Sequence, residues 1–110
     1  MVADEGRVIV HVVLISFRPH ATPEQQQQAL LEHRALGERC GGKDAGILLC
    51  QVEHNLDQRK NWHLMQLALF RDDAAFERFR AHPAHAQAVS VLREIADWAV
   101  GDIRSDLAMT

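Results

Sequence analysis

The segment from residue 7 to residue 17 constrains the fold more than any other part of the chain. It reads Arg-Val-Ile-Val-His-Val-Val-Leu-Ile-Ser-Phe, and it is largely apolar at both alternating sets of positions. Because successive side chains of a strand point to opposite faces, this segment predicts a central strand that is covered on both sides. Something must therefore pack against each face of its sheet.

A helix is expected directly after this strand. Thr22 is a good N-cap, Pro23 suits the first helical position, and Gln25 can complete a capping box. The helix is expected to run to about residue 39 and to end at a glycine pair. His33 lies in the middle of its apolar face, which carries Ala29, Leu30, Leu36 and Gly37.

The second half of the chain predicts three more strands and a pair of helices. Strands are expected over residues 47–53 and 62–70, and a final one over 98–104 that is broken by Gly101. Asp72 or Asp73 can cap a short helix that ends near residue 80. Pro83 opens another helix, and one face of it carries His85, Val89, Leu92 and Ala96.

This order of elements predicts a ferredoxin-like α+β sandwich (β-α-β-β-α-α-β) with strand order 4-1-3-2. We expect residues 1–110 to form a single domain, with a core from about residue 8 to residue 106. The helices can cover only one face of the sheet. Because the other face is also apolar, we expect a second copy of the chain to cover it, which makes the protein a homodimer.

Composition excludes several classes of partner. The net charge is −3 and the basic residues are scattered, which argues against binding to nucleic acid or to an anionic membrane. No apolar run approaches the roughly 18 residues of a membrane helix, and the acidic residues 1–6 do not resemble a signal peptide. Cys40 and Cys50 show no metal-ligand or redox spacing, so we expect free thiols and a cytoplasmic protein.

Histidines supply the candidate chemistry. His82-Pro83-Ala84-His85 places two of them at a helix start, while His11 and His63 lie in apolar strand-like runs, where a polar group is costly unless it is hydrogen-bonded. These four predict a shared polar site inside an apolar pocket. At the first helical turn, the helix dipole and burial both favour a neutral His85, the form that can accept a proton.

Each histidine also has a purely structural interpretation. His11 and His63 can be core histidines bonded to a neighbouring element, His82 can shape the turn before Pro83, and His33 can be a packing or interface residue. Zinc is not expected, because Pro83 and the strand positions oppose convergence of the four rings. The sequence predicts neither a metal nor a cofactor.

Three separated elements resemble the stress-responsive dimeric α/β-barrel family: the run from Val10 to Phe17, the pair Trp62-His63, and the segment His82-Pro83-Ala84-His85. The resemblance covers about residues 8–106 and implies a homodimer in which two ferredoxin-like sheets close into a barrel. Through a cofactor-free polyketide cyclase of that family, it implies that His85 is the general base. It also implies that the substrate contacts His11, His63, His82 and Phe79. That cyclase has a tyrosine at the position of Phe79, and this chain contains no tyrosine.

Two functions follow from the sequence. The first is binding of a small apolar molecule with a carbonyl or phenolic group, with aldol-type, cyclisation or isomerisation chemistry in which His85 is the base. The alternative is a non-catalytic stress or interaction protein that acts through its dimer surface.

Overall fold

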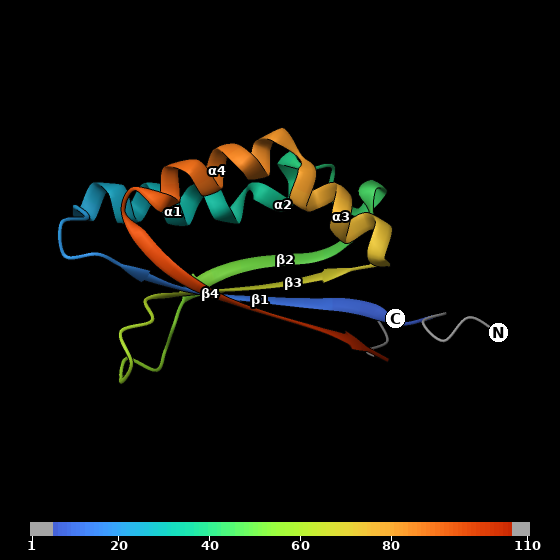
Figure 1. Cartoon of the computed structure of the whole chain (residues 1–110), viewed down its shortest axis with the longest axis horizontal. Helices are drawn as coiled ribbons and strands as arrows, with labels where there is room; N and C mark the ends of the chain where they lie inside the picture. The colour runs from blue at the N-terminus through green and yellow to red at the C-terminus, as the bar shows by residue number, and fades with distance from the viewer. Residues whose placement is uncertain (1–5, 107–110) are drawn as a thin grey trace.

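The computed structural model, which describes residues 6–106, is a four-stranded antiparallel sheet with all its helices on one face (Figure 1). Its strand order is β2-β3-β1-β4, which confirms the predicted ferredoxin-like α+β arrangement. Residues 1–5 and 107–110 of the expected domain, and with them most of the acidic N-terminal segment, lie outside the described residues. The elements are β1 (Val8–Phe17), α1 (Pro23–Arg34), α2 (Leu36–Arg39), the 3-10 helix η1 (Gly42–Ala45), β2 (Ile47–His54), β3 (Leu64–Phe70), α3 (Asp73–Ala81), α4 (Pro83–Arg93) and β4 (Ala96–Ser105).

Local side-chain caps start the helices as the sequence predicts. The Thr22 hydroxyl accepts from the Gln25 backbone N–H at 3.1 Å, and the Gln25 side chain accepts from the Thr22 N–H at 2.9 Å, which completes the capping box of α1. Asp72 caps α3 by accepting from the Ala75 N–H at 2.8 Å.

Three of the predicted boundaries were wrong. The helix expected to run to residue 39 is interrupted at Ala35, although the Arg39 N–H still donates to the Ala35 carbonyl, so the break is shallow. The final strand begins at Ala96, which we had assigned to the preceding helix, and it continues through Gly101 without a break. Its pairing with β1 is continuous, with Gly101 opposite Val12, and this ladder overrides the low strand preference of glycine.

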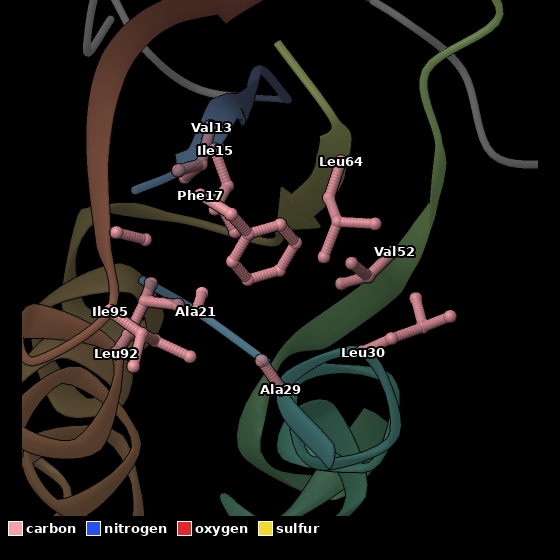
Figure 2. Packing of buried hydrophobic residues seen from close by; sticks show 11 residues of the cluster. Val13, Ile15, Phe17, Ala21, Ala29, Leu30, Val52, Leu64, Leu92 and Ile95 are labelled. Atoms are coloured by element: carbon pink, nitrogen blue, oxygen red, sulfur yellow. The ribbon is translucent and has the colours of Figure 1, made fainter. Parts of the chain in front are cut away.

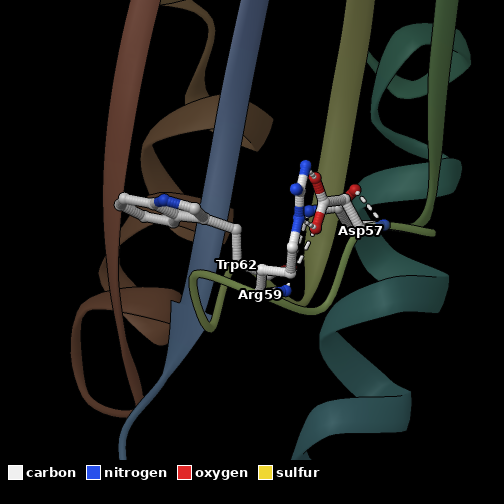
Figure 3. A network of polar contacts seen from close by, with 4 residues as sticks. Asp57, Arg59 and Trp62 are labelled. Atoms are coloured by element: carbon white, nitrogen blue, oxygen red, sulfur yellow. Dashed lines mark hydrogen bonds and ion pairs between the residues drawn. The ribbon is translucent and has the colours of Figure 1, made fainter.

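The third strand begins at Leu64 instead of residue 62, and Asn55 holds the connection that precedes it. The Asn55 backbone N–H donates to the His63 carbonyl, and its side-chain amide donates to the Trp62 carbonyl, both at 2.9 Å. Within the same connection, the Arg59 guanidinium bonds the Asp57 carboxylate at 2.7 and 2.9 Å and lowers the pKa of Asp57 (Figure 3). Trp62 points away from this ion pair (Figure 3).

The core between the sheet and the helices consists of two clusters. The first is built on Val13, Ile15 and Phe17 of β1, which point toward Val52 and Leu64 of the neighbouring strands (Figure 2). The second lies nearer the start of β1 and is rich in phenylalanine. It contains Ile9, Leu36, Cys40, Ile47, Ala68, Phe70, Ala75, Phe76, Phe79 and Ala88.

The opposite face of the sheet carries no helix (Figure 1). Apolar side chains cluster on it around Val10, which lies opposite Ile103 in β4 and Leu69 in β3. Met65 and Ile103 leave 39% and 63% of their surface exposed, so this face is apolar and partly open to solvent in the single chain. Within residues 6–106, no helix is long and apolar enough to cross a bilayer.

Gly37 allows α2 to approach β2, and this contact gives a test of the packing. A Cβ atom added at Gly37 would lie 2.7 Å from the Cβ of Cys50, and neither atom can swing aside. Alanine normally stabilises a helix relative to glycine by about 1 kcal/mol. We expect Gly37→Ala to do the reverse and to lower the free energy of unfolding by about 1–3 kcal/mol in urea denaturation.

The control is Ser90→Ala, which also introduces an alanine but at an exposed position of α4. It is expected to change the free energy of unfolding by no more than about 0.5 kcal/mol. If Gly37→Ala were as stable as the control, the close packing of α2 against β2 would be incorrect.

Candidate functional site

A cavity of about 370 Å³ lies between the helices and the middle of β1. Its apolar wall takes residues from both core clusters, including Val13 and Leu92 from the first and Leu36 and Phe76 from the second. The cavity therefore lies where the two clusters meet. Its polar groups are His11, His33, Gln66, Arg80, His85 and Asp102.

His11 reaches this cavity from the central strand. Odd-numbered side chains of β1 face the helices, and the strand register places His11 directly opposite Asp102 of β4. The His11 Nδ1 and the Asp102 Oδ1 are 2.5 Å apart. The imidazole is only 7% exposed and has ring contacts with Phe70, Phe76 and Phe79. The bond to Asp102 therefore offsets the cost of burying a polar ring among phenylalanines.

His85 lies in the first turn of α4, two residues after the helix-starting Pro83. Its ring packs edge-on against Phe79, with centroids 4.8 Å apart, and hydrogen-bonds the backbone of Arg80. Burial lowers the pKa of His85, and the neighbouring His11 and His33 lower it further. His85 is therefore neutral at neutral pH and can accept a proton, as the sequence predicts.

His33 is the third histidine of the cavity. It projects from the buried face of α1, and its Nδ1–H donates to the Ala29 carbonyl at 2.9 Å. Burial lowers the pKa of His33, although the bond to Ala29 and the charge of Glu32 oppose this effect. We had interpreted His33 as a packing or interface residue, and the structure adds it to the site.

The structure does not bring His63 and His82 to this cavity. The His63 ring stacks on Phe17 and accepts the Phe17 backbone N–H at 2.9 Å, and it lines a separate cavity of about 260 Å³. The reason is the antiparallel register of β1 and β3, which places Ala68 opposite His11. His63 lies near the other end of β1, where its backbone N–H donates to the Ile15 carbonyl. His82 is the N-cap of α4, where its Nδ1 accepts the Ala84 N–H at 3.0 Å.

Phe79 lies behind the cavity wall. It is 1% exposed, and its ring contacts both His11 and His85. It therefore separates and supports the two histidines without lining the cavity. Within the described residues, no group of three or more histidine, cysteine, aspartate or glutamate side chains is arranged to hold a metal ion.

Sequence reasoning missed Asp102, Arg80 and Gln66. Asp102 shares a strand face with Trp98 and Val100, which the alternation of β4 indicates, but only the register between β1 and β4 places it opposite His11. Gln66 is 3% exposed within an apolar strand, and such a residue is a signal of a buried polar site.

A ferredoxin-like sheet with one open apolar face and a histidine-lined cavity beneath its helices defines the class of this protein. The chain belongs to the stress-responsive A/B barrel domain family, whose model matches residues 9–105. Among curated proteins, no sequence matches this chain.

Solved structures share the fold at low sequence identity. A dimeric ferredoxin-like protein of unknown function from Thermobifida fusca superposes with a TM-score of 0.77 at 17% identity, covering 94% of this chain and 95% of that one. Hydroxynitrile lyase from Passiflora edulis gives 0.75 at 13% identity, covering 94% and 95%. SnoaB, a cofactor-independent oxygenase from Streptomyces nogalater, gives 0.69 at 17% identity, covering 93% and 96%.

The lowered pKa of His33 links protonation to stability. The unfolded chain binds a proton near the ordinary pKa of 6.5, whereas the folded chain binds it only at lower pH. The contribution of neutral His33 is therefore complete above pH 6.5 and is lost as pH falls below that value. In the wild type, the free energy of unfolding should fall between pH 7.5 and pH 5.0. We expect this fall to be smaller in His33→Leu, by up to about 1.4 kcal/mol for each pH unit.

Urea denaturation at several pH values measures this slope. The matched control is His20→Leu, which removes an exposed imidazole that bonds the Glu94 carbonyl. An unchanged slope in His33→Leu would show that His33 is not held in the neutral form by burial.

Proposed function

We propose that the protein binds a small, mainly apolar molecule with a carbonyl or phenolic group in the cavity between its sheet and its helices. One observation carries this proposal: the protein engages one ring nitrogen of each of the three cavity histidines. His11 bonds Asp102, His33 bonds the Ala29 carbonyl, and His85 bonds the backbone of Arg80. Burial favours the neutral forms of His33 and His85, so each of these two rings keeps its second nitrogen as an acceptor within a largely apolar cavity.

Acceptor nitrogens in an apolar cavity favour ligands that donate a proton. A phenolic or enolic hydroxyl can donate to such a nitrogen without leaving a buried polar group unpaired. A ligand carbonyl needs a donor, which the side-chain amide of Gln66 can supply, because its contact to the Cys50 Sγ is long at 4.0 Å.

We further propose that His85 is a general base for a reaction that needs no cofactor. Neutral His85 would take a proton from a carbon next to the ligand carbonyl and return it in a later step. Burial favours the neutral ring at neutral pH. The ring nitrogen that bonds the Arg80 backbone carries the proton, so the second ring nitrogen is free to act as the base. The SnoaB oxygenase, which is cofactor-independent, supports the idea that this fold can host a reaction without a cofactor.

We also propose that the protein is a homodimer that forms through the open face of the sheet, in the closed-barrel arrangement that the family resemblance implies. The apolar cluster around Val10 and the exposed Met65 and Ile103 support this face as the interface. The neighbour from Thermobifida fusca is described as dimeric, which supports a homodimer. Free Cys40 and Cys50 support the cytoplasmic location that the sequence predicted.

Ligand binding can be tested with phenolic acids, β-polyketide mimics and fatty acids in thermal denaturation. A ligand at about 100 times its dissociation constant should add about 2.7 kcal/mol to the free energy of unfolding. For a domain of this size, that corresponds to a rise in melting temperature of about 10 °C or more. We expect at least one phenolic or carbonyl compound to give this shift in the wild type and not in His85→Ala.

The control variant is His82→Ala, because His82 belongs to the same segment but caps the helix outside the cavity. It is expected to be less stable by about 1 kcal/mol, as for a lost N-cap, and to keep the ligand-induced shift. If no compound of these classes shifted the wild type, the alternative of a non-catalytic protein acting through its dimer surface would be favoured.

The dimer is tested by Met65→Lys. Met65 lies on the open face, and its cross-strand neighbour in β2 is Glu53, so a lysine is compatible with the single chain. A lysine buried between two apolar sheets would be unpaired or crowded, so we expect monomers in sedimentation velocity at concentrations where the wild type is a dimer. Leu31→Lys, on the exposed side of α1, is expected to remain a dimer. Equal dimer formation by both variants would exclude this face as the interface.

A further inference from the structure

Arg80 lines the cavity beside residues that contact the histidines. Its guanidinium carbon lies 5.1 Å from the centroid of the Phe76 ring, and Phe76 is part of the same cavity wall. The side chain has a 3.6 Å ion pair with Glu77, one turn earlier on α3. Both side chains of that pair are more than half exposed, at 54% and 67%, so solvent screens it and it holds Arg80 weakly.

Arg80 carries a permanent positive charge among the residues that line the cavity. The lining residues that can carry charge are His11, His33, Arg80, His85 and Asp102. The Asp102 carboxylate is engaged by His11, and burial favours the neutral forms of His33 and His85. The Arg80 guanidinium is therefore a cation at the cavity wall, and its ion pair with Glu77 is exposed and weak.

We propose that Arg80 binds a carboxylate of the ligand, so that the ligand class is small aromatic or apolar monocarboxylic acids. This inference rests on the proposed function, because it assigns the substrate class of the same cavity. A planar guanidinium can bond both oxygens of a carboxylate, which gives affinity and a defined orientation. One cation matches one negative charge, which favours a monocarboxylate over a doubly charged phosphate ester.

Arg80 also connects this anchor to the candidate base. Its backbone bonds the His85 ring, and its charge is near enough to contribute to the lowered pKa of His85. A carboxylate bound to Arg80 would therefore place the remainder of a small ligand close to His85. Arg80 is in this sense a specificity-determining residue, whereas His85 would carry out the proton transfer.

The test compares 4-hydroxybenzoate with 4-hydroxybenzamide, which have nearly the same size and shape but differ in charge. Isothermal titration calorimetry measures both dissociation constants for the wild type, Arg80→Gln and Arg93→Gln. Arg93→Gln makes the same change at an exposed position in the last turn of α4, away from the cavity. We expect the wild type and Arg93→Gln to bind the carboxylate at least about tenfold more tightly than the amide. Arg80→Gln should bind both compounds with the affinity of the amide.

A second variant gives an opposite prediction. Glu77→Gln removes the competing carboxylate beside Arg80, so it should bind 4-hydroxybenzoate more tightly than the wild type does and leave amide binding unchanged. The proposal is overturned if the wild type binds both compounds equally, or if Arg80→Gln keeps the preference for the carboxylate. If both compounds bind equally and His85→Ala abolishes both, the assignment of Arg80 falls and the proposed function stands. If neither compound binds the wild type, the cavity does not bind small phenolic ligands of this class. Ligand binding in the cavity and carboxylate binding by Arg80 are then both rejected for this class.

Discussion

The contact between His11 and Asp102 is the interaction on which the rest of the site depends. A histidine in the middle of the most apolar strand is tolerated only if its ring nitrogens are bonded, and the 2.5 Å contact to Asp102 supplies one such bond. The contact requires one particular register between β1 and β4, because a shift by one residue would turn Asp102 to the open face. Strand register and chemistry are therefore coupled at this pair.

The position of the cavity follows from the division of the core. Phenylalanines fill the space near the start of β1, and aliphatic side chains fill it near the end, with His11 between them. Three imidazoles share the space that remains. Burial lowers the pKa of His33 and of His85, and the two neighbouring histidines lower the pKa of His85 further. The same desolvation that destabilises charged histidines leaves neutral His33 and His85 with nitrogens that can accept protons.

Much of the fold could be predicted from local patterns, whereas the site depended on contacts that no local pattern specifies. A run that is apolar at both alternating sets of positions predicted β1 as a central strand, and the Thr22 cap predicted the start of α1. Both features depend only on neighbours in sequence. The partnership of His11 with Asp102 spans the whole domain and required the register of two strands. The sequence predicts His63 in the shared pocket because strands one and three are neighbours, but the register between them places Ala68, not His63, opposite His11.

The two faces of the sheet are connected through its edge strand. β4 supplies Trp98, Val100 and Asp102 to the cavity, yet most of its residues are exposed. Within residues 6–106, β4 pairs with β1 alone. Ile103 lies next to Asp102 in sequence and points to the open face. In the proposed dimer, burial of Ile103 would restrain the same backbone that positions the Asp102 carboxylate. Association of two copies would then restrain the bond between His11 and Asp102. Burial of the open face would in this way stabilise the cavity on the other side of the sheet.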